Sequence, residues 1–251
     1  MKKVLVAVLI ANTFVVAGEQ FSMSEADKKM YEELLENNPA DMDVEAGMEL
    51  FEELGDEEAL AKFLEVEPKA LAEYIAGFPR YVKKMGNVVG IDQVLQALQV
   101  VQGEKMSPLN SDEIFTMQAY VKSLANDIKI NIDVKENKKM EESYTLGESL
   151  YMTARGYRGL SCNSCHALDG AILRTQPLPE MGKANTGGTW PAYRMTLSKL
   201  ITMQERSRGC MRDAGQEPLP LGSKEMVALE VYITNLAKKH EKVIAIPGLK
   251  R

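Results

Sequence analysis

The chain has 251 residues, of which 45% are hydrophobic, so it can build one large or two small globular cores and is neither fibrous nor intrinsically disordered. Its net charge of -6 and its 6% aromatic content argue against nucleic-acid binding. The charge is unevenly spread: acidic residues outnumber lysines 17 to 3 between Glu19 and Glu67, whereas basic residues outnumber acidic ones 9 to 3 between Tyr151 and Arg212. A cationic second half suits an anionic substrate or partner.

Residues 1–18 have the pattern of a secretory signal peptide. Two lysines precede the apolar run Val4–Val16, and the small pair Ala17-Gly18 follows it. The run is short for a membrane span, although it also fits a buried N-terminal helix. No cysteine lies near the exit and no later apolar stretch could anchor the chain, so we expect a periplasmic protein without a membrane anchor. Residues 19–46 are then an N-terminal extension, with a polar helix starting after Ser24 as its N-cap.

The rest of the chain repeats itself. Two segments recur at an offset of 112 residues and one at an offset of 100, so the second copy holds 12 more residues between its first helix and its Pro-x-Tyr element. The matching segments are Pro79-Arg80-Tyr81 with Pro191-Ala192-Tyr193, Pro108–Glu113 with Pro220–Glu225, and Gly47–Phe51 with Gly147–Tyr151. Such a register predicts a duplicated domain.

The expected organisation is a domain at 47–127, a linker at 128–146, a second domain at 147–240 and a tail at 241–251. Both copies space their apolar residues as helices do, which predicts a mainly α fold. The linker is expected to begin with a short strand, since Ile128, Ile130, Ile132 and Val134 alternate with polar neighbours. The helical positions are Leu95, Leu98, Val101, Ile114, Met117, Val121, Leu124, Met226, Leu229, Ile233 and Leu236.

The second copy carries the segment Cys162-Asn163-Ser164-Cys165-His166. At this spacing two thiols can attach to a haem while the histidine binds its iron, so we predict one covalently attached haem c. A redox dithiol would not need the histidine, and a zinc site would need a second ligand pair, which Cys210 and His240 supply poorly. The first copy has neither cysteine nor histidine. The fold is therefore expected to be two tandem cytochrome c-like domains, the first without haem.

The spacing of the Cys-x-x-Cys-His motif does not identify the second axial ligand of the iron. The candidates are Met181, Met195, Met203, Met211, Met226, His240 and Cys210. Cys210 is either a small core residue or a functional thiol; once haem takes the other two thiols, no internal disulfide can form. Arginines surround it in Arg206-Ser207-Arg208-Gly209-Cys210-Met211-Arg212, a setting that stabilises a thiolate and can hold an anion. On a helix, Arg206 and Cys210 share a face.

These residues resemble the SoxA family, the cytochrome subunit of the sulfur-oxidising SoxAX complex. The resemblance rests on Cys162–Gly170, on Gly188–Arg194 and on Gln204-Glu205-Arg206 leading to Cys210. It implies that His166 and Cys210 are axial haem ligands, that Cys210 is the catalytic sulfur, able to carry a persulfide, and that Arg206 binds the anion. The first copy departs from two-haem members because it lacks a Cys-x-x-Cys-His motif.

The resemblance also implies an activity and partners. The activity is that of an L-cysteine S-thiosulfotransferase, in which thiosulfate is oxidatively coupled to a cysteine of a SoxYZ-like carrier protein and electrons leave to a SoxX-like cytochrome. Two alternatives stay open: a thiosulfate dehydrogenase that releases tetrathionate, and a plain periplasmic electron-transfer cytochrome c in which a methionine binds the iron.

Overall fold

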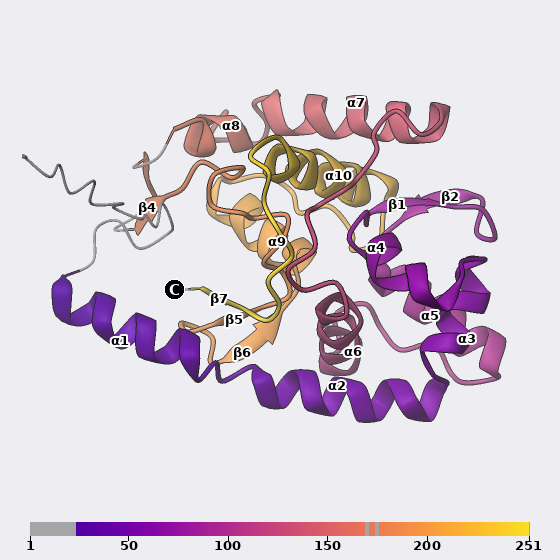
Figure 1. Cartoon of the computed structure of the whole chain (residues 1–251). Helices are drawn as coiled ribbons and strands as arrows, with labels where there is room; N and C mark the ends of the chain where they lie inside the picture. The colour runs from indigo at the N-terminus through magenta and orange to yellow at the C-terminus, as the bar shows by residue number, and fades with distance from the viewer. Residues whose placement is uncertain (1–23, 169–170, 174–175, 251) are drawn as a thin grey trace, which may run out of the picture.

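The computed structural model describes residues 24–168, 171–173 and 176–250 and is mainly helical (Figure 1). The predicted signal peptide 1–18 lies outside the described residues. The first part of the chain contains α1 (Glu25–Glu36), α2 (Asp41–Leu54), α3 (Glu57–Leu64), a 3-10 turn at Pro68–Ala70, α4 (Leu71–Ile75), β1 (Arg80–Val82), β2 (Asn87–Val89), α5 (Ile91–Gln102) and α6 (Asp112–Ser123). The second part contains α7 (Lys138–Met152), α8 (Cys162–His166), β3 (Ala171–Leu173), β4 (Gln176–Leu178), β5 (Ala192–Arg194), β6 (Lys199–Ile201), α9 (Met203–Asp213), α10 (Lys224–Lys239) and β7 (Gly248–Lys250).

Side-chain caps fix where several helices begin. The Ser24 hydroxyl accepts a hydrogen bond from the Asp27 N–H, which confirms the predicted start of α1. Ser111 caps α6 by accepting from the Ile114 N–H, and Ser223 caps α10 by accepting from the Met226 N–H. The caps of α6 and α10 thus lie at the offset of 112 residues seen in the sequence.

The hairpins and the helix that follows them recur at the same offset. The β1–β2 hairpin pairs Arg80 with Val89, and the β5–β6 hairpin pairs Ala192 with Ile201, in the same antiparallel register. A cis proline precedes each hairpin, Pro79 in the first and Pro191 in the second. Helix α5 follows the first hairpin as α9 follows the second, and β7 adds a parallel third strand beside β5.

Two helix pairs also correspond. Helix α2 packs on α6 along the lower edge of the molecule, and α7 packs on α10 along the upper edge (Figure 1). Glycine allows both close approaches: a Cβ at Gly47 would collide with the Thr116 carbonyl, and one at Gly147 would collide with the Ala228 carbonyl. Thr116 and Ala228 are themselves 112 residues apart.

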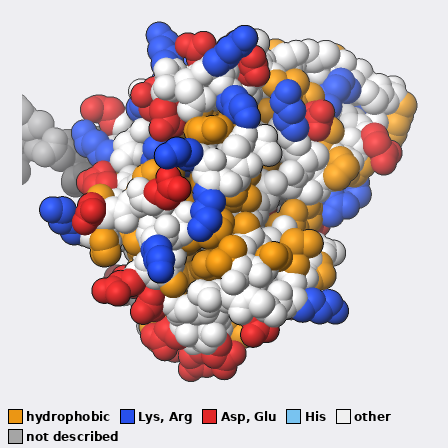
Figure 2. Space-filling model, turned by 90° about the vertical axis from the view of Figure 1, so that its right-hand side faces the viewer, with side chains coloured by type: hydrophobic (Ala, Val, Ile, Leu, Met, Phe, Trp, Pro, Cys, Tyr) orange, Lys and Arg blue, Asp and Glu red, His pale blue; other side chains and the backbone are white. Residues whose placement is uncertain are grey.

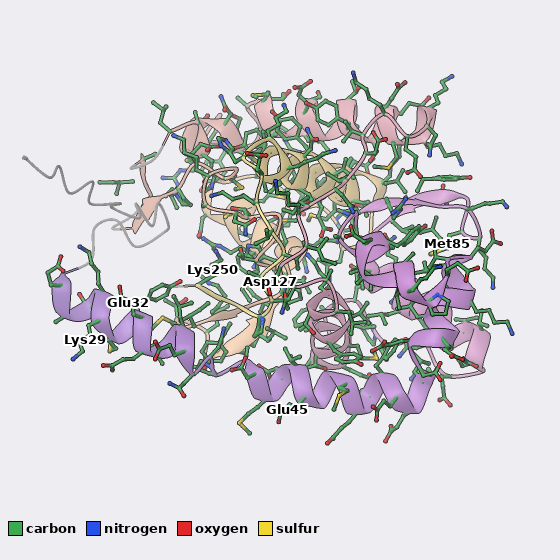
Figure 3. The ribbon with its side chains drawn as sticks, viewed as in Figure 1. Lys29, Glu32, Glu45, Met85, Asp127 and Lys250 are labelled. Atoms are coloured by element: carbon green, nitrogen blue, oxygen red, sulfur yellow. The ribbon has the colours of Figure 1, made fainter. Side chains whose placement is uncertain are left out.

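The two parts of the chain pack against each other reciprocally. Helix α6 of the first part contacts β6 of the second, and α10 of the second contacts β2 of the first. Buried apolar side chains form one core cluster that runs from Ala40 to Ile246. The N-terminal helix and the tail are also joined, because the Tyr31 hydroxyl donates to the Leu249 carbonyl and the Asn38 amide donates to the Pro247 carbonyl. Asp127 and Lys250 line the groove between these segments (Figure 3).

Some expectations differ from the structure. Residues 128–134 do not form a named strand: Lys129 makes one isolated bridge to Val243, although Ile130 and Ile132 are buried as the alternation predicted. Val101 is 59% exposed, because α5 turns this position away from the core.

The surface reflects the charge distribution in the sequence. Acidic side chains gather at the foot of the molecule in Figure 2, the level at which α2 runs in Figure 1. Among the described residues, no helix combines the length and apolar character needed to cross a membrane.

Candidate haem and anion site

A pocket of about 1150 Å³ lies where α8, α9 and α10 meet, and part of it is open to solvent. It brings together all five site residues predicted from the sequence, which come from two helices more than 35 residues apart in the chain. Its lining residues are Ser161, Cys162, Cys165, His166, Leu178, Pro179, Met181, Thr186, Trp190, Arg194, Met203, Arg206, Ser207, Cys210, Met211, Ala214, Gln216, Leu229 and Ile233. The mainly apolar wall with a few polar groups is typical of a cofactor site.

Helix α8 presents the two cysteines of the haem motif. A reciprocal capping box starts it: the Ser161 hydroxyl accepts from the Ser164 N–H, and the Ser164 hydroxyl accepts from the Ser161 N–H. Cys162 and Cys165 are one turn apart, both half-buried at the pocket wall. Burial, and next the electrostatic influence of Cys210, raise the pKa of Cys162 to about 11. The Cys162 thiol is therefore protonated at neutral pH and lies near Cys210.

His166 is oriented as a metal ligand. The residue is 8% exposed, and its Nδ1 lies 2.8 Å from the Pro179 carbonyl oxygen. A carbonyl can only accept, so this hydrogen bond places the ring proton on Nδ1 and leaves the lone pair on Nε2. Metal-binding histidines are commonly fixed in this way by a backbone carbonyl. The Tyr151 hydroxyl, 3.4 Å from the His166 carbonyl oxygen, ties the end of α8 to α7.

Helix α9 carries the cationic side of the pocket. The Thr202 hydroxyl caps it by accepting from the Glu205 N–H, and Arg206 and Cys210 follow on one face, one turn apart. Glu205 pairs with Arg208 at 3.1 Å and with Arg212 at 3.9 Å. Among the described residues Arg206 has no acidic partner within ion-pair distance, so its charge is available to an anion in the pocket.

The pocket narrows the list of candidate axial ligands. Met181, Met203 and Met211 line it together with Cys210, whereas Met195 and Met226 do not. His240 also lies elsewhere: it caps α10, and its Nε2 is 3.6 Å from a carboxylate oxygen of Glu180. Within the described residues no three His, Cys, Asp or Glu side chains form a metal-binding group.

Trp190 and Pro179 are site residues that sequence reasoning did not single out. Trp190 is 2% exposed and lines the pocket, and its indole Nε1–H has no hydrogen-bond partner among the described residues. A buried donor without an acceptor is costly, and a haem propionate in the pocket would supply the acceptor. The orphaned indole, the lone pair of His166 and the paired thiols of α8 therefore fit haem c. The signal for Trp190 was that it is the chain's one tryptophan, beside the repeated proline.

Comparison with known proteins bears on the same region. The family model described as "SoxA/TsdA, cytochrome c domain" matches residues 146–241, which include α8, α9 and α10. The L-cysteine S-thiosulfotransferase subunit SoxA of Hydrogenophilus thermoluteolus is 31% identical, over 96% of this chain and 93% of the relative. The chain belongs to the SoxA family.

Further SoxA relatives are more distant. The SoxA subunit from Chlorobaculum thiosulfatiphilum is 27% identical, over 85% of this chain and 73% of its own length. The fold matches the crystal structure of SoxXA from P. pantotrophus with a TM-score of 0.73, at 21% identity, over 89% of this chain and 84% of the matched chain. SoxA family membership and the matched cytochrome c domain place covalent haem c in this protein, as the Cys-x-x-Cys-His motif predicted.

Proposed function

We propose that this SoxA-family chain is the haem-bearing subunit of an L-cysteine S-thiosulfotransferase. The observation that carries the proposal is the placement of Arg206 and Cys210 one turn apart on α9, both lining the pocket that His166 also lines. A general electron carrier needs neither an arginine nor a thiol there, because a methionine from the pocket wall could bind its iron. An anion-binding group beside a sulfur suits chemistry on thiosulfate.

The residues that would hold the cofactor are those already grouped in the pocket. Cys162 and Cys165 would form the two thioether bonds, and His166 Nε2 and the Cys210 sulfur would bind the iron. Bound there, haem c supplies a one-electron acceptor beside the reacting sulfur. The Pro179 carbonyl keeps the His166 ring in the ligating tautomer throughout.

The reaction joins the outer sulfur of thiosulfate to a cysteine sulfur of a carrier protein. One S–S bond forms, the carrier thiol loses its proton, and two electrons leave, one at a time, to an external cytochrome of the SoxX type. Arg206 would bind the sulfonate oxygens through paired charge-assisted hydrogen bonds. The Cys210 sulfur, bound to the iron, would link formation of the S–S bond to removal of electrons by the haem.

The decisive experiment replaces Cys210 by alanine in the haem-loaded protein. Thiosulfate-dependent modification of the carrier cysteine, read by mass spectrometry, should be abolished while covalent haem, read as the pyridine haemochrome, persists. Met203→Leu is the matched control, since it changes another pocket residue at nearly constant volume and should keep turnover. Retained turnover in Cys210→Ala would contradict the proposal.

A second candidate is thiosulfate dehydrogenase, because the matching family model covers both SoxA and TsdA proteins. The same Arg206 and Cys210 would serve a coupling of two thiosulfate ions to tetrathionate. An assay for free tetrathionate with thiosulfate and an electron acceptor, but no carrier protein, separates the two. Tetrathionate formed at the rate of carrier modification would favour the dehydrogenase.

We further propose that the chain holds one haem and that its first half is a haem-less cytochrome c-like domain. In the first half, the positions 112 residues before six pocket residues are all buried apolar side chains. For Trp190, Arg194, Arg206, Cys210, Leu229 and Ile233 these are Phe78, Val82, Val94, Leu98, Met117 and Val121. Their packing supports a first half in which protein side chains take the volume of a cofactor.

The partners and the location complete the proposal. The matched solved structure is a SoxXA complex, which supports a heterodimer of this chain with a SoxX-like cytochrome, and a SoxYZ-like protein would bring the carrier cysteine. Covalent haem attachment and the signal-like residues 1–18 both suit the periplasm.

A further inference from the structure

Three ionisable side chains are buried together where the two halves of the chain meet. Asp92 of α5 is 3% exposed, Lys122 of α6 is 5% exposed and Glu230 of α10 is 7% exposed. Burial lowers the pKa of Lys122, and the charges of Glu230 and Asp92 oppose that shift only in part. The function proposed above uses none of the three.

Lys122 reaches from the first half into the pocket wall of the second. Its Nζ donates to the Trp190 carbonyl oxygen at 2.6 Å. Trp190 is the pocket residue whose buried indole N–H has no hydrogen-bond partner among the described residues, and it is followed by the proline that leads into β5. A buried hydrogen bond from an ammonium is strong and directional, so it fixes the backbone from which this indole projects.

The carboxylate of Glu230 makes a separate contact with α9. Its Oε2 accepts from the Gln204 amide at 2.9 Å, and Gln204 Oε1 in turn accepts from the Gly222 N–H at 2.9 Å. Gln204 lies in the first turn of α9, two residues before Arg206. The first half joins here as well, because the Gln93 amide donates to the Gly222 carbonyl at 2.9 Å.

Three of the residues in these contacts lie in the pocket wall or directly beside it in the chain. Trp190 lines the pocket directly, Gln204 is next to the lining residue Met203, and Glu230 is next to the lining residue Leu229. Apolar side chains of similar size would fill this space without loss of stability, since buried ion pairs seldom stabilise more than hydrophobic replacements do. The buried ions and hydrogen bonds instead fix the relative positions of the segments that they join.

We propose that Lys122 is a positioning residue for the haem site, through which the first half of the chain sets the geometry of the haem pocket in the second half. It holds the Trp190 backbone directly, through the hydrogen bond from its side-chain nitrogen to the Trp190 carbonyl oxygen. The inference rests on the proposed haem site. It gives the first half a role that needs no cofactor of its own.

The test uses the haem-loaded full chain with Lys122→Met. We expect covalent haem to persist, while the low-spin electron paramagnetic resonance (EPR) signal of the oxidised protein broadens or splits and the reduction potential shifts from the wild-type value. Lys129→Met is the matched control: Lys129 forms an exposed ion pair with Glu241, and its loss should leave both readings unchanged.

A second variant separates positioning from charge balance and carries the test if Lys122→Met does not fold. Lys122→Met/Glu230→Gln removes one buried charge of each sign, so it should fold without restoring the hydrogen bond to Trp190. Altered EPR and potential in this variant support the inference. Wild-type EPR and potential in a folded Lys122→Met, or their return in the double variant, overturn it. A wild-type protein that binds no haem would instead overturn the proposed function.

Discussion

Gly147 of α7 packs directly against the backbone carbonyl of Ala228 in α10. The gap between the two helices closes to backbone contact at this point, so no side chain larger than hydrogen fits there. Helix α7 contacts α8, and α10 contributes Leu229 and Ile233 to the pocket wall. The contact between α7 and α10 therefore sets the distance between α8 and this wall.

Gly147→Ala should lower the free energy of unfolding by roughly 1–3 kcal/mol, the usual cost of overpacking a tight contact. Chemical denaturation of the haem-loaded protein measures it. Gly209→Ala is the control: Gly209 is also helical, but a Cβ there would meet no atom closer than 3.7 Å, so alanine should stabilise α9 slightly. Equal destabilisation by both variants would show that the helix contact is not the cause.

The EPR spectrum of the oxidised, haem-loaded protein should show a low-spin thiolate signal. Cys210→Ala should remove that signal, whereas Met181→Leu should preserve it, although both residues line the pocket. A histidine–methionine signal in the wild-type protein would contradict the role of Cys210 and favour an electron-transfer cytochrome.

Arg206→Gln should raise the KM for thiosulfate about tenfold or more, because a charge-assisted hydrogen bond contributes roughly 1.5–3 kcal/mol to binding. Haem content should stay at the wild-type level. Steady-state kinetics at limiting thiosulfate provide the measurement.

Arg208→Gln is the matched control for that variant. Arg208 lies on the same helix, but it pairs with Glu205 at 3.1 Å and does not line the pocket. Its loss should change KM much less. An equal rise in KM for both variants would indicate a general effect of positive charge and not a binding role of Arg206.

Asp92 should make the stability of the protein depend on pH. Burial, and next the charge of Glu230, raise the pKa of Asp92 from 3.8 to about 7. The folded state therefore keeps a proton that the unfolded chain releases above about pH 4, and the stability associated with this group falls as the pH rises from about 4 to about 7. The slope is about 1.4 kcal/mol per pH unit at most.

Asp92→Asn should flatten the fall in unfolding free energy between about pH 4 and pH 7, measured by urea denaturation at several pH values. Asp112→Asn is the control, since the Asp112 side chain is 83% exposed. Parallel stability curves for wild type and Asp92→Asn would mean that this carboxyl does not hold its proton in the folded state.

The sequence by itself determined the haem motif, the placing of the proposed functional cysteine and arginine on one helix face, and the repeated elements. Cys162, Cys165 and His166 are close along the chain, and Arg206 and Cys210 share a face of one helix, so local spacing was sufficient to group each set. Ser24 as an N-cap likewise predicted where α1 begins. The expected strand at 128–134 failed because a strand needs a neighbour along its length, and only residues 128–130 pair with the segment 242–244.

Only the tertiary structure decided how these local sets meet. The Pro179 carbonyl selects the tautomer of His166 from 13 residues away, and Lys122 reaches the Trp190 carbonyl across 68 residues. No pattern along the chain encodes such pairs, because a backbone carbonyl leaves no mark on residue type and a buried lysine looks like a solvated one. Which charges are buried together, and which wall of the pocket they support, depends on how the two halves of the chain pack.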